Sequence, residues 1–426
     1  MASPVGLFRK AGWNIVDQAL SALSNTLLSV IVARSVNADG FGAFSVAFVV
    51  FGIALALTRS VVGSPLQIRF SSHSGDSFSS AVGRASGLAV LLGVATGILC
   101  LCAGLLLGGV SGAALVALAV ILPGLLLQDT CRMAFFARGD ARSAALIDAV
   151  WSVVQVAILA ALIWNGQRSV GPLVLAWGAA AAVSAVLGFK LLRCVPRPRQ
   201  AFEWMREQRD VTRYLFAEYF LGLGASQIAI LLVGVIAASS AVGSLRAAQV
   251  LLGPLAIVGV AAFQFAMPEF ARRPDLSSRR RWWAGLGLSG LLGSVTICYL
   301  TLLLLIPDRL GVQLFGDSWE GASAVLLAMG LSSLASSLAN GPACVLYGMG
   351  LAKNTFRINL AKAPILLLLV LTGTWLWGAV GAAWGLAAVE AMVLPLWVLT
   401  LRRALNVVDH TPPVRLTDDD QQHLAQ

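Results

Sequence analysis

The feature that most constrains this chain is a series of about twelve apolar stretches joined by short polar loops. About 20 apolar residues in an α-helix cross the hydrocarbon core of a bilayer, and a helix satisfies its own backbone hydrogen bonds there. Hydrophobic residues make up 58% of the 426 positions and charged residues only 12%, whereas soluble domains are about 25% charged. The sequence therefore predicts an all-α polytopic membrane protein.

The basic residues lie in alternate loops between the expected helices. Of the 30 lysines and arginines, 25 belong to the termini and to the loops after the second, fourth, sixth, eighth and tenth spans, whereas the opposite loops hold only Arg168 and Arg309. The positive-inside rule then places both termini in the cytoplasm and requires an even number of spans. We expect helices at 12–34, 40–62, 83–108, 112–130, 143–164, 171–192, 213–238, 245–268, 283–306, 321–347, 358–377 and 379–401.

Charge and cysteine usage exclude several classes of protein. The net charge of +10 would indicate nucleic-acid binding in a soluble protein, but here the basic loops set orientation in the membrane, so we expect no nucleic-acid partner. The six cysteines contain no CxxC pair, which argues against a disulfide framework and against a metal site. We expect no cofactor.

The basic segment 193–212 divides the chain into two halves of six spans each. We expect an N-terminal lobe at 1–192, a cytoplasmic linker with an interfacial helix at 193–212, a C-terminal lobe at 213–403 and a disordered cytoplasmic tail at 404–426. Weak matches between the halves recur in order at offsets of about 204 to 211 residues, for example Ala43 with Ala247. Two lobes related by an axis along the membrane normal would give this pattern.

Ionisable and amide side chains inside a span are costly, so each is a candidate for cavity lining or gating. Five polar residues of the first span, including Asp17 and Asn25, share one helical face, which fits either a wet cavity or contact with a neighbouring helix. The other candidates for cavity lining or gating are Arg59, Glu218, Arg246, Gln249, Gln264 and Glu390. Each of them also has a purely structural interpretation, such as an arginine whose side chain extends to the membrane interface, or an ion pair within the protein. The sequence alone does not identify the partner of Glu390, for which Lys362 and an arginine of the other lobe are both candidates.

Charged residues also gather at the loop between the fourth and fifth expected spans. Asp129, Arg132, Arg138 and Asp140 are candidates for salt bridges that close a cytoplasmic gate. The alternative, which we favour, is that they only solvate a loop, since surface ion pairs are common and individually weak.

Motifs of catalysis are missing from the sequence. The three histidines lie in loops or the tail, without HExxH, and there is no GxxxxGK[ST] phosphate loop or GxSxG nucleophile motif. We therefore do not expect an enzyme or an ATP-driven pump.

Short motifs in the first third of the chain resemble a known family. The segment 27–35, followed by Gly40-Phe41-Gly42-Ala43-Phe44 and by the 59–69 segment, is similar to the first two helices of polysaccharide-lipid flippases of the multidrug/oligosaccharidyl-lipid/polysaccharide exporter superfamily. The segment 135–142 is similar to the connection between their fourth and fifth helices.

The resemblance implies two six-helix lobes that surround a central cavity and alternate between inward-open and outward-open states in the bacterial inner membrane. It also implies a polyprenyl-diphosphate-linked oligosaccharide as substrate, whose sugar head crosses a cavity while the lipid tail stays in the bilayer. Arginines suit a diphosphate because guanidinium binds phosphate oxygens in a bidentate way. We expect H⁺ or Na⁺ as the coupling ion and membrane lipids or polysaccharide-assembly proteins as partners. The alternatives are a cation-coupled multidrug antiporter and a non-catalytic partner in envelope assembly.

Overall fold

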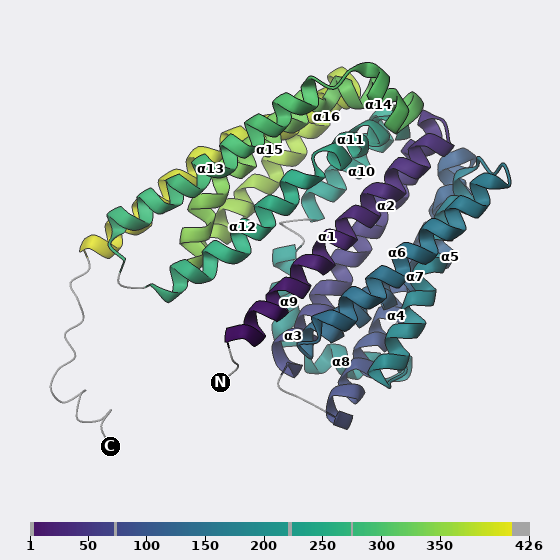
Figure 1. Cartoon of the computed structure of the whole chain (residues 1–426), viewed down its shortest axis with the longest axis horizontal. Helices are drawn as coiled ribbons and strands as arrows, with labels where there is room; N and C mark the ends of the chain where they lie inside the picture. Colours follow the sequence, from purple (N-terminus) through teal and green to yellow (C-terminus); the bar gives the residue numbers. More distant parts are fainter. Residues whose placement is uncertain (1–3, 72–74, 220–223, 274–275, 411–426) are drawn as a thin grey trace.

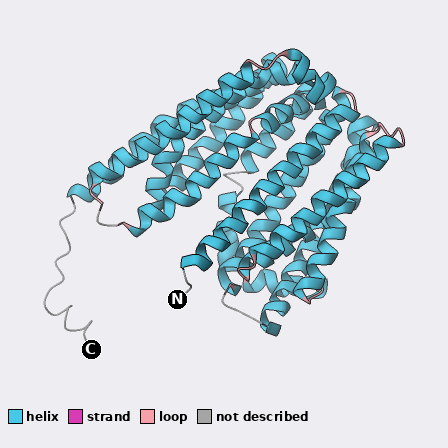
Figure 2. Ribbon diagram, in the orientation of Figure 1, coloured by secondary structure: helices cyan, strands magenta, loops and turns pink. Residues whose placement is uncertain are grey.

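The computed structural model describes residues 4–71, 75–219, 224–273 and 276–410 (Figure 1). Within these residues every regular element is a helix (Figure 2). The predicted all-α fold is therefore confirmed. The helices fall into two groups, one formed by the first half of the chain and one by the second, and we call them the N-lobe and the C-lobe.

The N-lobe contains six long crossings. In chain order its elements are α1 (Pro4–Ser35), α2 (Ala38–Thr58), a π-helical turn (Arg59–Gly63), α3 (Ser64–Phe70), α4 (Gly75–Leu107), α5 (Gly109–Ala137), α6 (Ala141–Trp164) and α7 (Val170–Leu192). Polar caps set two of the starts, because the Asn37 side chain accepts from the Gly40 N–H and the Asp140 side chain accepts from the Ser143 N–H.

A short linker leads to the C-lobe. It comprises a 3₁₀ turn (Pro198–Gln200), α8 (Ala201–Glu207) and the start of α9 (Arg209–Tyr219). The C-lobe continues with α10 (Ala225–Ala237), α11 (Ser239–Leu251), α12 (Gly253–Arg272), α13 (Ser278–Leu304), α14 (Asp308–Phe315), a 3₁₀ turn (Gly316–Ser318), α15 (Trp319–Gly348) and α16 (Ala352–His410). The helical stretch thus runs through 404–410, which the sequence had assigned to the tail, and 411–426 lies outside the described residues.

The α16 segment is a hairpin rather than one straight helix. Its backbone leaves the helical conformation at Trp377 and Gly378, and the two arms then lie against each other. A Cβ on Gly381 would fall 1.8 Å from the Gly373 carbonyl oxygen. Two glycines at this contact let the arms approach closely, as in other tightly packed membrane helices.

Apolar helices long enough to cross a membrane recur along the described residues. Eight described helices are long and apolar enough to cross a membrane, and α11 with α12, bent by 56°, makes a ninth. Leu20–Ser35 and Ala225–Ala237 are shorter apolar helices, and α16 supplies two arms. The chain is a multi-pass membrane protein, and the division into twelve crossings with six in each lobe stays a prediction.

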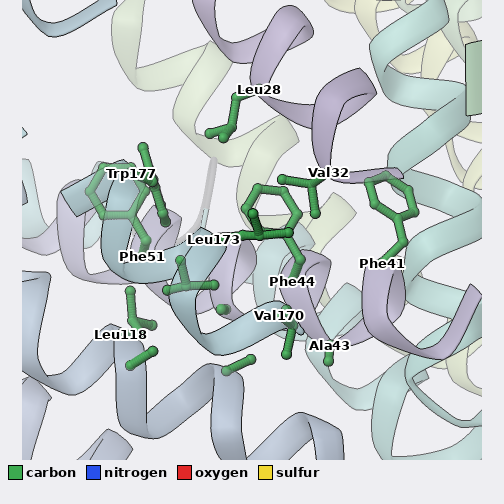
Figure 3. Close-up of a cluster of buried hydrophobic side chains, with 14 of the residues drawn as sticks. Leu28, Val32, Phe41, Ala43, Phe44, Phe51, Leu118, Val170, Leu173 and Trp177 are labelled. Carbon is green, nitrogen blue, oxygen red and sulfur yellow. The ribbon is translucent and has the colours of Figure 1, made fainter. Parts of the chain in front are cut away.

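Aromatic residues of α2 hold the N-lobe core together (Figure 3). Trp177 of α7 is fully buried and its ring lies 5.0 Å from Phe51, 5.5 Å from Phe48 and 6.1 Å from Phe44, measured between centroids. Offset and edge-to-face pairs at such distances add to the energy of burial. The α2 helix is thereby fixed to its own lobe, while its other faces remain available to the C-lobe.

The two lobes meet where α2 crosses α11. A Cβ on Gly42 would lie 2.3 Å from the Ser239 carbonyl, and one on Gly243 would lie 3.1 Å from the Gly42 backbone. Both contacts are at the end of the molecule opposite the chain termini. We call the end with both termini and the arginine-rich loops the basic end (Figure 1).

Candidate functional site

The candidate site is a cavity of about 780 Å³ in the C-lobe. It lies among α11, α12, α15 and the second arm of α16, and this volume falls in the range of small-molecule binding sites. Its described lining comprises Gln249, Leu252, Leu255, Ala256, Gly259, Val260, Phe263, Met329, Ser332, Ser333, Ser336, Ser337, Asn340 and Glu390.

A row of small polar side chains on α15 gives the cavity its chemistry. Ser332, Ser336 and Asn340 follow one another at four-residue intervals, so they share one helical face. Within the described residues none of their side chains makes a hydrogen bond, and neither does the Gln249 side chain on α11. The cavity therefore presents hydroxyl and amide groups that are free to bind a polar ligand.

The acidic group of the cavity is neutralised inside the lobe. The Glu390 carboxylate accepts a hydrogen bond from the Lys362 ammonium, across the two arms of α16. Both side chains are partly buried, and the ion pair offsets the negative charge of the carboxylate. The described lining of the cavity thus combines apolar and polar side chains, and its one carboxylate is paired.

Arg246 stands at the contact between the lobes, one helical turn from Gln249. Its guanidinium carbon lies 3.7 Å from the centroid of the Phe48 ring, and its Nη2 atom donates to Ser29 Oγ over 3.4 Å. The Nε atom is buried without a hydrogen-bond partner. In the described part of the chain no carboxylate pairs with Arg246, so its charge is compensated by an aromatic face and a hydroxyl alone.

Arg59 has a different environment, because it belongs to a buried ion-pair network of the N-lobe. It lies in the π-helical turn and donates from Nε and Nη2 to the two oxygens of Asp129, over 2.9 and 2.6 Å. Arg132 lies 3.3 Å from Asp148 and 3.9 Å from Asp129. Asp129, Arg132 and Asp148 are all buried, and the two positive and two negative charges balance.

The four residues considered as a cytoplasmic gate therefore divide into two pairs. Asp129 and Arg132 are inside the N-lobe and not at its mouth. Arg138 and Asp140 form a local pair, 3.0 Å apart, in the loop between α5 and α6. Although partial burial opposes it, hydrogen bonds from Ser143 and the charge of Arg138 lower the pKa of Asp140. All of these ion pairs are within one lobe, and this arrangement favours support of the N-lobe over closure between lobes.

The structure brings some of the predicted site residues together. Gln249 and Glu390 line the C-lobe cavity, and Arg246 lies beside it at the lobe contact. Asn25 is half-buried in α1, four residues before Ser29. The side chains of Asp17, Glu218 and Gln264 lie outside the described residues. Sequence reasoning missed the polar row on α15, although the serines and Asn340 recur there at helical spacing.

Comparison with known proteins identifies the fold. No protein-family model matches the sequence, and no curated protein is significantly similar to it. Among solved structures, the inward-facing form of a multidrug resistance MATE family transporter of the MOP superfamily is 15% identical, with 95% of this chain and 96% of that chain covered and a TM-score of 0.69. The lipid II flippase MurJ, in an inward closed conformation, is 10% identical, with 91% and 87% covered and a TM-score of 0.72.

An outward-facing MATE transporter structure is also similar, at 12% identity, 94% and 97% coverage and a TM-score of 0.62. The resemblance to this superfamily, first seen in short motifs, is thus supported across the whole chain at the level of the fold.

Proposed function

We propose that this protein moves a lipid-linked oligosaccharide across the bacterial inner membrane by alternating access of its two lobes. The observation that carries the proposal is Arg246, whose buried Nε has no hydrogen-bond partner and which pairs with no described carboxylate, beside a cavity that carries free amide and hydroxyl groups. The fold supports it, because a MATE multidrug transporter and the lipid II flippase MurJ share it. Both termini face the cytoplasm in this proposal, and the substrate leaves toward the outer leaflet.

Arg246 would bind the diphosphate of the substrate. A desolvated cation without an anionic partner is costly, and a phosphate oxygen regains the lost interaction through short, charge-assisted hydrogen bonds. Its Nε atom is the donor that the protein leaves unsatisfied, and guanidinium can use Nε together with a terminal nitrogen for bidentate contact. Arg59 is not available for this role, since Asp129 already occupies that pair of donors.

The cavity would bind the sugars. Ser332, Ser336, Asn340 and Gln249 offer donors and acceptors in the mixture that sugar hydroxyls require. Gln249 lies three residues after Arg246, which is about 4.5 Å along the helix axis. In a diphosphate-linked glycan the first sugar is bonded directly to the phosphate, so adjacent sites for the two groups fit such a molecule.

We further propose coupling to an H⁺ or Na⁺ gradient, with Glu390, the carboxylate in the described lining of the cavity, as the coupling group. An antiporter for cationic drugs is the alternative. It fits less well, because Glu390 is paired with Lys362 and the unpaired charge at the lobe contact is positive. We also propose that the protein interacts with polysaccharide-assembly proteins.

The proposal is tested in proteoliposomes that contain a short-chain polyprenyl-diphosphate oligosaccharide with a fluorescent label. We expect wild type to transfer the lipid between leaflets, and Arg246→Gln to be slower by about tenfold or more, since a charged hydrogen bond contributes about 1.5–3 kcal/mol. Arg168→Gln, which removes an exposed loop arginine, is the matched control and should keep the wild-type rate. A folded wild type that leaves the lipid in place but exports cationic dyes would contradict the proposal and support the antiporter.

A further inference from the structure

A second hollow lies on the N-lobe, away from the lobe contact and at its basic end. It is a groove of about 720 Å³ bounded by α4, α5, α7 and the loop that follows α7. Its floor is where Gly124 of α5 meets Ala182 of α7, and its walls include Leu127, Val186 and Phe189. Val186 is 56% exposed. Because Val186 belongs to the apolar helix α7, which is long enough to cross a membrane, the open side of the groove faces lipid.

The length of the groove matches one leaflet. From Ala182 to Arg193 the α7 axis rises about 16 Å at 1.5 Å per residue. This is close to half of the hydrocarbon core, which is about 30 Å thick. The apolar part of the groove can therefore hold an acyl chain of the leaflet at the basic end.

Three cations surround the mouth of the groove. They are Lys190 in the last turn of α7, Arg193 at its C-terminus and Arg197 in the following loop. Within the described residues none of the three pairs with a carboxylate, and the Arg197 guanidinium donates only to Ser80 Oγ over 3.2 Å. Burial raises the pKa of the neighbouring Cys194 thiol to about 11, so this group adds no negative charge at neutral pH.

The loop that carries Arg197 is held firmly in place. The backbone at Arg193 has φ 53°, a left-handed conformation that is unfavourable for any residue with a Cβ, and it ends α7 abruptly. The chain then runs over α4, where the Arg197 N–H donates to the Gly83 carbonyl over 2.8 Å. A Cβ on Gly87 would be only 2.2 Å from the Arg197 carbonyl oxygen, so α4 accepts the loop only because it has a glycine there.

We propose that this groove binds one anionic phospholipid of the leaflet at the basic end. Its acyl chain lies between α5 and α7, and its phosphate contacts Lys190, Arg193 and Arg197. The basis is charge complementarity, since basic pockets between membrane helices on the cytoplasmic side select anionic head groups. The site is separate from the C-lobe cavity and does not depend on the proposed transport function.

The test compares lipids on the purified full-length protein by native mass spectrometry. Phosphatidylglycerol is titrated against phosphatidylcholine with the same chains, on wild type and on Lys190→Gln/Arg193→Gln/Arg197→Gln. We expect wild type to retain phosphatidylglycerol preferentially. The triple variant should bind phosphatidylglycerol at least about tenfold more weakly than wild type does. The control is Arg142→Gln/Arg206→Gln/Arg209→Gln, which removes three exposed cations outside the groove and should retain the preference.

A second variant separates the groove from general charge attraction. Val186→Trp fills the apolar wall and leaves all three cations in place, so it should also release the bound phosphatidylglycerol. Gel filtration confirms that each variant is folded before the titration. Equal affinity of wild type for the two lipids, equal loss in both triple variants, or full retention by Val186→Trp would each overturn the proposal.

Discussion

The crossing of α2 and α11 provides a direct test of movement between the lobes. A Cβ on Gly42 would lie 2.3 Å from both the carbonyl carbon and oxygen of Ser239, and backbone atoms cannot rotate away as a side chain can. Gly42→Ala must therefore separate the helices. Overpacking of this kind costs about 1–3 kcal/mol, which corresponds to a shift of about 5-fold to 150-fold against the conformation in which the lobes touch here.

The control for Gly42→Ala is Gly287→Ala in α13, where a Cβ would meet nothing within 4 Å. Both substitutions raise helix propensity by about 1 kcal/mol, but this gain is the same in every conformation in which the residue is helical and does not shift the equilibrium. Only Gly42→Ala changes the lobe contact.

The assay is electron–electron distance measurement between spin labels at Arg168 and Arg309. Both residues are exposed and lie on different lobes at the end opposite the basic end. We expect Gly42→Ala to move population toward longer distances and Gly287→Ala to match wild type. Identical distance distributions for all three proteins would refute the reasoning, because they would show that the contact at Gly42 does not limit separation of the lobes.

Three further predictions concern stability of the N-lobe. Arg59→Met leaves the buried Asp129 without its bidentate partner and should destabilise the protein by about 3–5 kcal/mol in denaturant unfolding, and a loss below 1 kcal/mol would contradict a buried ion pair. Trp204→Phe removes the 3.0 Å bond from the indole N–H to the Val61 carbonyl and should cost about 1 kcal/mol in the same assay. Asp140→Ala removes the α6 cap at about 0.5–2 kcal/mol. Because the folded pKa of Asp140 is lowered, this contribution is present above its ordinary pKa and disappears as pH falls through the lowered value, as melting curves across that range would reveal.

The sequence predicted the crossing segments well because length and hydrophobicity determine them directly. It did not predict α14, a short helix in an exposed loop, where neither property applies. The separation of α11 from α12 was missed for a similar reason, since a break at Leu252 and Gly253 leaves the apolar pattern continuous. The turn at Trp377 and Gly378 was placed correctly, because glycine there allows the positive φ of 58°.

The ion-pair partner of a charged residue was harder to predict than the helix and the helical face on which the residue lies. Arg59 and Asp129 are 70 residues apart, and helical periodicity shows which face a residue occupies but not which helix lies against it. For Glu390 the sequence left two candidates, Lys362 and an arginine of the other lobe, and the structure pairs Glu390 with Lys362. The α15 serine row was missed because ionisable residues were treated as the main signal of a cavity, whereas most of the polar groups in the cavity that is found are neutral.

The internal repeat predicted from the sequence relates the Arg59–Asp129 pair to two residues of the C-lobe cavity. At the offset of 211 residues the C-lobe counterpart of Asp129 is Asn340, and at the offset of 204 the counterpart of Arg59 is Phe263. Both counterparts line the C-lobe cavity, whereas Arg59 and Asp129 satisfy each other inside the N-lobe. In the N-lobe these positions join the π-helical turn after α2 to α5, whereas in the C-lobe they face the cavity. We infer that an ion pair at these positions would fill and rigidify the space, and that an amide and an aromatic ring there leave room for a cavity in the C-lobe.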